Sequence, residues 1–134
     1  MICDEGVMMP RRAREGDAAY DIYAPHRLVL NNRWQTVDLG FRFEEGDIPP
    51  GWAALVITRS STGAKDGLHI RNVPGLIDSG YRQNLKATLS MDGQEKVYEK
   101  DDRILQFIII PVGVIPNEIP PEGTRTGGYG STGV

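Results

Sequence analysis

Residues 36–43 read TVDLGFRF, and apolar side chains occupy every second position of this stretch. A hydrophobic period of two over eight residues predicts a strand with one face in a core and the other toward solvent. Residues 85–91, LKATLSM, repeat the same alternation. Residues 53–57 and residues 104–110 are instead almost continuously apolar, which is typical of strands covered on both faces. These four segments predict an all-β chain.

Turn residues between the segments predict two hairpins. The dipeptide Asp-Gly at 92–93 favours the backbone conformation that two-residue hairpin loops require. We therefore expect residues 96–98 to return beside the strand at 85–91. A second hairpin is expected over residues 28–35, which turn at an Asn-Asn pair.

Helix makes little contribution to the expected fold. One short helical turn fits, near residues 61–65. Residues 94–110 lack glycine and proline, but stepping through them at helical spacing meets charged residues, so no apolar stripe forms. Short strands separated by turns rich in glycine and proline are typical of a β-sandwich or barrel. Residues from about 122 to 134 are rich in glycine with little to pack, and we expect them to form a mobile C-terminal arm.

Length and composition exclude several classes of protein. The chain has 134 residues, which suits one domain spanning 1–134, and its formal net charge is −3. Charged residues make up 25% and hydrophobic residues 40%, which excludes a coiled coil and a strongly basic nucleic-acid-binding protein. The single cysteine, Cys3, cannot form an internal disulfide, and no apolar run approaches the roughly 20 residues of a membrane-spanning helix. We expect a soluble, cytoplasmic protein with no membrane or nucleic-acid partner.

A first candidate site follows the apolar run at 53–57. Arg59-Ser60-Ser61 would present a guanidinium, two hydroxyl groups and turn amides at a strand end, which suits the binding of an anion. The alternative is that Arg59 pairs with a surface carboxylate while the serines cap a helical turn. Gln106 interrupts the last apolar run, so its amide needs a partner if it is buried.

A second candidate is Asp78, which lies between two glycines in GLIDSGYR, residues 75–82. An ionised aspartate on a rigid turn can orient a water molecule and accept its proton when phosphates and a metal make that water more acidic. The alternative is an Asx-turn in which Asp78 bonds its own backbone. Asp17 and Asp21 could face a hydrated metal, although neither belongs to a dense ligand cage.

The C-terminal residues 125–133, RTGGYGSTG, combine glycine amides and hydroxyl groups with Arg125 and Tyr129. Such a loop can wrap phosphates, and its aromatic ring can stack on a planar base. It is not a P-loop, because no Gly-Lys-Ser/Thr follows at the required spacing. The alternative is that a glycine-rich terminus is merely disordered.

Taken in order along the chain, these segments resemble the five motifs of the trimeric dUTPase family, the deoxyuridine triphosphate nucleotidohydrolases. The matching segments are DAAYDI (17–22), RSS (59–61), NVPGLIDSGYR (72–82), DRILQ (102–106) and GGYGSTG (127–133). The resemblance implies a jelly-roll-like, distorted β-barrel and a homotrimer with active sites shared between subunits. It also implies hydrolysis of dUTP to dUMP and pyrophosphate with Mg²⁺ on the triphosphate, which limits uracil incorporation into DNA and supplies dUMP for dTTP synthesis.

The resemblance implies a role for each matching residue. Asp78 would activate the water that attacks the α-phosphorus, and Tyr81 would pack under the deoxyribose and leave no room for a 2′-hydroxyl. Asn72, with backbone groups of its hairpin, would read the uracil edge. Asp21 would lie near the hydrated metal, and Tyr129 from a neighbouring subunit's arm would lie above the base. The remaining substrate-binding positions are Arg59, Ser60 and Gln106 at the phosphates, with Ser61, Gly75, Ile77, Arg125, Gly130 and Ser131.

Three positions depart from the family pattern. Tyr129 stands where the family usually has phenylalanine, and a tyrosine can still stack on a base. Arg125 precedes this aromatic residue by four positions rather than five, so its contact with the γ-phosphate is either shifted or weakened. Gln83 replaces a glycine that commonly follows the Tyr-Arg pair, a change that affects the sheet edge rather than the chemistry.

Two other functions stay open from the sequence. The dCTP deaminases share the fold and an Ile-Asp-x-Gly-aromatic turn, but they need a glutamate base shortly after that turn, and residues 85–91 contain none. A non-catalytic trimeric nucleotide-binding regulator would be indicated by the loss of Asp78, Arg59 or the arm, and all three are present. The residues therefore favour dUTP hydrolysis over both alternatives.

Overall fold

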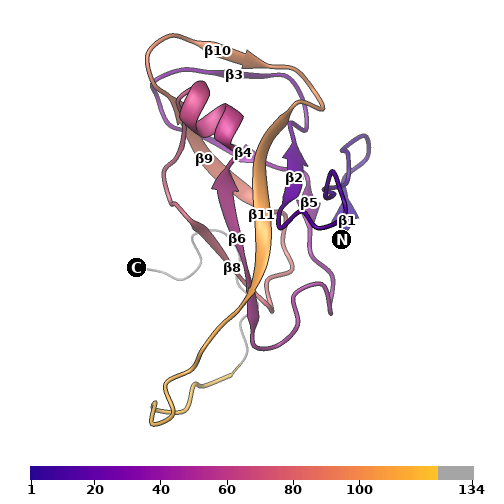
Figure 1. Ribbon diagram of the computed structural model, residues 1–134, viewed down its shortest axis with the longest axis vertical. Helices are drawn as coiled ribbons and strands as arrows, with labels where there is room; N and C mark the ends of the chain where they lie inside the picture. The colour runs from indigo at the N-terminus through magenta and orange to yellow at the C-terminus, as the bar shows by residue number, and fades with distance from the viewer. Residues whose placement is uncertain (124–134) are drawn as a thin grey trace.

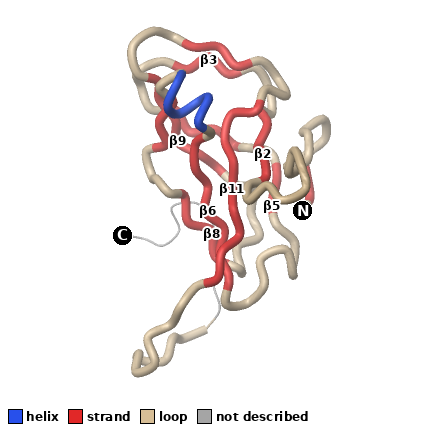
Figure 2. The backbone as a smooth tube through the Cα atoms, in the orientation of Figure 1, coloured by secondary structure: helices blue, strands red, loops and turns tan. Residues whose placement is uncertain are grey.

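The computed structural model describes residues 1–123, which contain eleven strands and one short helix. The strands are β1 (Ile2–Cys3), β2 (Tyr20–Tyr23), β3 (Leu28–Leu30), β4 (Gln35–Asp38), β5 (Phe41–Arg42), β6 (Trp52–Thr58), β7 (Leu68–Ile70), β8 (Gly75–Asp78), β9 (Lys86–Met91), β10 (Lys96–Tyr98) and β11 (Arg103–Pro111). The helix η1 (Ser60–Lys65) follows β6 and is the helical turn that was expected near residues 61–65 (Figure 2). The all-β architecture expected from the sequence is confirmed.

Two antiparallel sheets enclose the core. The first sheet has the order β2-β11-β6-β8, and the second has the order β4-β9-β7. Figure 1 shows the ribbon of β3 and β10 across the top of the barrel, with η1 below it at the end of β6. β11 and β6 pair from Leu105 opposite Thr58 to Pro111 opposite Trp52. These two long strands form the centre of the first sheet, with β2 and β8 at its edges.

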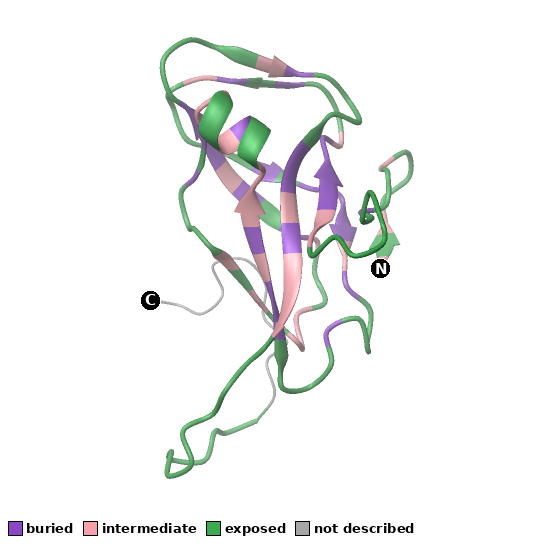
Figure 3. Ribbon diagram, viewed as in Figure 1, coloured by how far each residue is buried: buried purple, intermediate pink, exposed green. Residues whose placement is uncertain are grey.

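The predicted alternation places Val37, Leu39, Phe41 and Phe43 in the core, where all four are buried (Figure 3). The rings of Phe41 and Phe43 lie 6.0 and 5.2 Å from the ring of Phe107 on β11. Burial of side chains of this size contributes about 1.5–3 kcal/mol each. This aromatic cluster therefore ties the N-terminal half of the chain to the long strand of the first sheet.

The alternating segment bends at Gly40, which separates β4 from β5. Gly40 has a φ of +76°, and a Cβ atom there would lie 2.7 Å from Cγ2 of Val7. Glycine alone adopts this conformation without strain and leaves room for the valine. At the bend the backbone N–H of Asp4 donates to the carbonyl of Gly40 (2.8 Å). The N-terminal residues are thereby held against the end of β4.

Both predicted hairpins are wrong, because strands distant in sequence take the expected positions. β10 pairs with β3 rather than β9, with Val97 opposite Val29. Both edges of β9 are occupied, by β4 on one side and β7 on the other. The buried ring of Tyr98, whose hydroxyl donates to Asp66 (2.9 Å), instead holds β10 near η1. No helix within residues 1–123 is long and apolar enough to cross a membrane.

Candidate active site

Arg59 is fixed at the end of β6 by the short helix that follows it. Its backbone N–H donates to the hydroxyl of Thr62 (3.2 Å). That hydroxyl is buried and donates in turn to the carbonyl of Ile104 in β11 (2.8 Å). The helix η1 is therefore bonded to the first sheet through the hydroxyl of Thr62, a contact that we call the latch. The latch sets the direction in which Arg59 leaves the strand.

Three oxygen atoms hold the guanidinium of Arg59. Its Nε donates to Oδ1 of Asp21 (3.1 Å), and Nη1 donates to the hydroxyl of Ser61 (2.9 Å) and the carbonyl of Arg103 (3.3 Å). Asp21 is only 8% exposed, and Nη1 of Arg103 lies 3.8 Å from its second carboxylate oxygen. Arg59 thus pairs with a buried carboxylate rather than a surface one, and its position is set before any anion binds.

Gln106 joins this group through the sheet. It lies opposite Ile57 of β6 and Asp21 of β2, and its Nε2 donates to the carbonyl of Thr58 (3.1 Å). This bond supplies the partner that a half-buried amide requires. The expected phosphate and metal positions therefore gather at one end of β6. We call this group the arginine cluster; its members are Asp21, Arg59, Ser60, Ser61 and Gln106.

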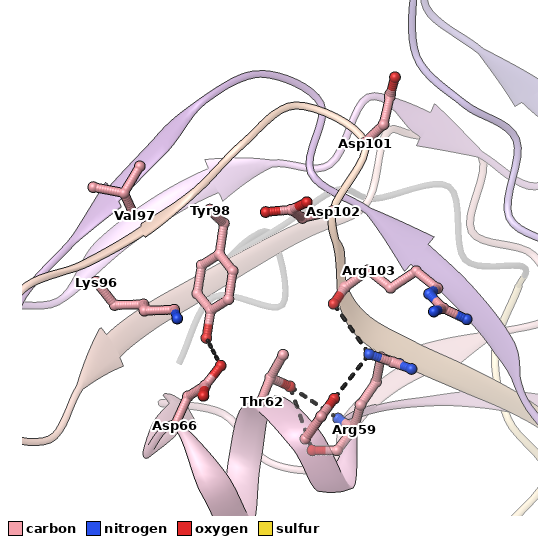
Figure 4. A pocket seen from close by; sticks show the side chains of 10 residues that line it. Arg59, Thr62, Asp66, Lys96, Val97, Tyr98, Asp101, Asp102 and Arg103 are labelled. Carbon is pink, nitrogen blue, oxygen red and sulfur yellow. Dashed lines mark hydrogen bonds between the residues drawn. The ribbon is translucent and has the colours of Figure 1, made fainter.

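The arginine cluster borders a pocket of about 340 Å³ between η1 and the loop that leads into β11 (Figure 4). Three cationic side chains line the pocket, those of Arg59, Arg103 and Lys96. The other lining residues are Ser61, Thr62, Asp66, Val97, Tyr98, Asp101 and Asp102. With cations and carboxylates on its walls, this space suits a polar, hydrated ligand.

Asp78 is an exposed residue at the end of β8, the edge strand of the first sheet. The turn that follows it is closed by a hydrogen bond from the backbone N–H of Tyr81 to the carbonyl of Asp78 (3.1 Å). The guanidinium of Arg82 donates to the carbonyls of Ser79 (2.8 Å) and Tyr81 (3.0 Å). The aspartate therefore stands on a closed turn whose backbone is held at three carbonyl groups.

Asn72 and Gly75 lie on the segment that leads from β7 through β8 into this turn. Asn72 is exposed, whereas Ile77 is half-buried against the core. A Cβ atom at Gly75 would lie 3.2 Å from Cβ of Val56, so glycine lets β8 approach β6 closely. The expected base and sugar positions therefore lie on one continuous segment, from the loop before β8 to the turn after it, which was expected to be a hairpin but whose flanking strands β7 and β8 pair with β9 and β6 instead. We call them the hairpin cluster; its members are Asn72, Gly75, Ile77, Asp78 and Tyr81.

Asp78 and Arg59 lie toward opposite ends of one strand pair. β8 runs antiparallel to β6, with Asp78 opposite Ala53. Arg59 lies beyond the far end of β6, a separation from Ala53 of roughly 20 Å at about 3.3 Å per residue. A single chain therefore does not bring Asp78 and Arg59 to the same phosphate group.

Some residues that shape the site were missed by the sequence analysis. Thr62 holds the arginine cluster, but a threonine in a short helix carries no distinguishing signal. Arg82 holds the turn after Asp78 and lies in the matching segment 72–82, so that segment could have suggested it. Arg103 lies in a matching segment, so that segment could have suggested its place beside Asp21. The expected arm residues lie outside the described part of the chain; they are Arg125, Tyr129, Gly130 and Ser131.

Residues 1–123 offer no dedicated metal cage. They contain no group of three or more His, Cys, Asp or Glu side chains that could hold a metal ion. The carboxylate of Asp21 lies between the guanidinium groups of Arg59 and Arg103. This arrangement fits a hydrated ion that arrives on the phosphates of a ligand and reaches Asp21 through water.

The chain matches known proteins over nearly its whole length. A protein-family model described as dUTPase matches residues 5–133. The deoxyuridine 5'-triphosphate nucleotidohydrolase of Gloeobacter violaceus is 32% identical over 133 residues, with 93% of this chain and 88% of the relative covered. The protein of the same name from Cutibacterium acnes is 38% identical over 133 residues, with 94% and 86% covered.

Solved structures share the fold. The dUTPase of Staphylococcus bacteriophage 80alpha, solved with dUpNHpp, has a TM-score of 0.71 at 24% identity and covers 100% of this chain and 96% of its own. A variant dUTPase from phage phi11 of S. aureus, whose structure describes a structural Mg(II) ion, has a TM-score of 0.73 at 22% identity, with 92% and 95% covered. The curated relatives exceed 30% identity, and the family model spans almost every residue. The chain therefore belongs to the dUTPase family.

Proposed function

We propose that this protein is a dUTP diphosphatase, which hydrolyses dUTP to dUMP and pyrophosphate. The observation that carries the proposal is the exposed Asp78 on its closed turn, in a chain whose relatives are named for this activity. The product dUMP would supply dTTP synthesis, and the removal of dUTP would limit uracil incorporation into DNA.

Asp78 would act as the general base. Its carboxylate would orient a water molecule toward the α-phosphorus and take a proton from it as the new P–O bond forms. The bond from the α-phosphorus to the bridging oxygen breaks, and pyrophosphate leaves with the electron pair. Phosphoryl transfer needs positioning and charge stabilisation above all, and the prearranged guanidinium of Arg59 would supply both at the phosphate oxygens.

The hairpin cluster would select the nucleoside. The half-buried ring of Tyr81 would lie under the deoxyribose and exclude a 2′-hydroxyl. The amide of Asn72 and the backbone beside Gly75 and Ile77 would pair with the uracil edge. A cytosine in this place would leave polar groups unmatched, and such mismatches can give rejection on the order of 10⁴-fold.

The separation between Asp78 and Arg59 supports a site shared between copies of the chain. The outer face of the first sheet carries Leu55, Ile57, Ile108 and Ile110, which are only half-buried in one chain. Leu76 lies opposite Leu55 and is 60% exposed. A second copy packed on this face would bury its apolar surface and could bring its own hairpin cluster to the arginine cluster of the first.

We propose the homotrimer of the family as this assembly. The chain beyond β11 runs away from the barrel and then turns back on itself (Figure 1), with the N–H of Glu118 donating to the carbonyl of Ile115. Three apolar side chains on this segment, Val114, Ile115 and Ile119, are 74%, 73% and 92% exposed. Exposed apolar side chains suit contact with a neighbouring copy, and the arm residues that follow would then close over that neighbour's nucleotide.

Magnesium would enter with the substrate as a complex with the triphosphate. The ion supplies positive charge that neutralises phosphate oxygens. Asp21 and the hydroxyl groups of Ser60 and Ser61 would meet the hydrated complex at the arginine cluster, while Asp21 stays paired with Arg59. The protein's own contribution is thus a preformed surface for the hydrated phosphates.

A panel of four nucleotides tests the proposal. The purified protein is incubated with magnesium and with dUTP, dCTP, dTTP or UTP in turn, and pyrophosphate and ammonia are measured. We expect pyrophosphate from dUTP alone. Ammonia from dCTP would instead identify a deaminase, and nucleotide binding without any product would identify a regulator.

A further inference from the structure

We propose that Asn84, a residue outside both clusters, is a positioning residue that sets sugar selectivity by holding the ring of Tyr81. The inference rests on the function proposed above, in which this ring lies under the deoxyribose. The phenol of Tyr81 donates to the backbone carbonyl of Asn84 (3.3 Å). The tilt of the ring therefore depends on where that carbonyl is held.

The side chain of Asn84 is a bridge between two carboxylates. Its Nδ2 donates to Oδ2 of Asp4 (2.9 Å) and to Oδ1 of Asp38 (3.2 Å). A carboxamide nitrogen carries two hydrogens, so each carboxylate takes one of them. The oxygen of Asp38 also accepts the backbone N–H of Gly40 (2.8 Å). One amide thus ties the turn after Tyr81 to the N-terminal residues and to the end of β4.

The backbone just after Asn84 is anchored independently. Leu85 is buried, its N–H donates to the carbonyl of Phe41 (2.9 Å), and its carbonyl accepts the N–H of Leu39 (2.8 Å). The turn from Asp78 to Asn84 therefore leaves the core at a fixed point. The side-chain bridge of Asn84 then sets the direction of its carbonyl, and with it the position of the Tyr81 ring.

The two acids require a hydrogen-bond donor at position 84. A carboxylate at position 84 has almost the same shape as the amide, but it would lose both donors and add a third negative charge beside Asp4 and Asp38. Asn84→Asp is therefore a small change that breaks the bridge. Combining Asp4→Asn with Asn84→Asp gives a reversed bridge, in which the amide at position 4 donates to the carboxylate at position 84 and Asp38 keeps its oxygen for the N–H of Gly40.

The experiment compares kcat/KM for dUTP and for UTP in each variant, after size-exclusion chromatography and circular dichroism have shown the native assembly. For Asn84→Asp we expect the dUTP-to-UTP ratio to fall roughly tenfold, the effect of one lost hydrogen bond to a positioned group. The reversed bridge restores one of the two hydrogen bonds and should recover part of the ratio. The control Asn32→Asp, which adds the same charge in the exposed turn after β3, should leave the ratio unchanged.

Two results would overturn the inference. A folded Asn84→Asp variant with the wild-type ratio would show that the bridge does not position Tyr81, as would a folded reversed bridge that recovers nothing. The variant Tyr81→Ala separates this failure from that of the proposed function. If Tyr81→Ala also keeps the wild-type ratio, the sugar role of Tyr81 itself is wrong and the inference falls with it.

Discussion

Arg59 and Asp78 differ in how their surroundings tolerate substitution. The side chains of Arg59 and its partner Asp21 are 23% and 12% exposed, so removing one partner leaves the other charge poorly hydrated. Asp78 instead stands on an exposed turn held by backbone contacts. Substitutions at Arg59 should therefore change stability and substrate binding together, whereas substitutions at Asp78 should mainly change kcat.

Asp78→Asn tests the role of the base. The amide keeps the size of the side chain but cannot take a proton from water, so we expect kcat to fall by about 10²–10⁴-fold. Binding of dUTP should stay within a few-fold of wild type, because the phosphate and base contacts lie elsewhere. Single-turnover kinetics and calorimetric titration measure the two quantities, and a kcat within threefold of wild type would exclude Asp78 as the base.

Tyr98 should make stability depend on alkaline pH. Burial, and then the hydrogen bond to Asp66, raises the pKa of the Tyr98 phenol well above its ordinary value of 10.0. The folded state thus keeps the proton that the unfolded state releases above about pH 10. The contribution of Tyr98 to the free energy of unfolding is complete below that pH and declines as the pH rises further.

Tyr98→Phe removes both the hydrogen bond and this titration. We expect the variant to be less stable than wild type by about 1–2 kcal/mol at neutral pH. The difference should shrink between pH 10 and pH 11.5, since only the wild type loses the contribution. Urea denaturation of both proteins across this range measures the difference, and a constant difference would contradict the prediction.

At the scale of secondary structure, the strands were predictable and their partners were not. Alternation identified the buried faces of residues 36–43 and 85–91, because a period of two depends on the local pleat alone. The partner of β10 depended on which edges were free after β4, β7 and β9 had assembled. That competition is settled by contacts distant in sequence, so an Asp-Gly dipeptide could not reveal it.

For the candidate site, too, one part was predictable from the sequence and another part was not. The residues expected to act were found from their motif, and the structure shows how Arg59 and Gln106 are held. The groups that contact the site residues were not found, because no motif marks them: Thr62 is held by the carbonyl of Ile104, which only the fold brings near, and Asn84 offers its carbonyl to Tyr81. The arm residues lie outside the described part of the chain, so their roles stay predictions.

The latch of η1 gives a prediction at this scale. Thr62→Val removes the hydroxyl that joins Arg59 to Ile104 and leaves the buried carbonyl without its donor. We expect a loss of about 1–3 kcal/mol in the free energy of unfolding and a higher KM for dUTP. Thr62→Ser keeps the hydroxyl and should stay close to wild type in KM; equal KM values for the two variants would exclude the latch as the device that places Arg59.

For the whole molecule, the decisive feature is that one chain holds the two halves of the site roughly 20 Å apart. The strand register sets this distance, so no side-chain movement within one barrel closes it. The half-buried apolar face of the first sheet and the exposed segment after β11 both favour assembly with further copies. Activity should therefore be a property of the assembly.

Mixing two inactive variants tests this assembly. Arg59→Gln keeps a donor for Asp21 but loses the positive charge and the further N–H donors of the guanidinium. Asp78→Asn loses the base. Each protein alone should therefore have little turnover. The two variants are unfolded together in equal amounts and refolded. A shared site takes Arg59 from one chain and Asp78 from another, so about one in four randomly formed sites has both residues intact. We therefore expect roughly a quarter of wild-type turnover. Unchanged, near-zero turnover in folded mixed trimers would show that each site is built from one chain.

The attack of water on the α-phosphorus is tested most directly by turnover of dUTP in water enriched in oxygen-18. Mass spectrometry of the products locates the label, since the oxygen of the attacking water stays on the phosphorus that it attacks. We predict one labelled oxygen in dUMP and none in pyrophosphate. Label in pyrophosphate with unlabelled dUMP would place the attack at the β-phosphorus and contradict the role given to Asp78.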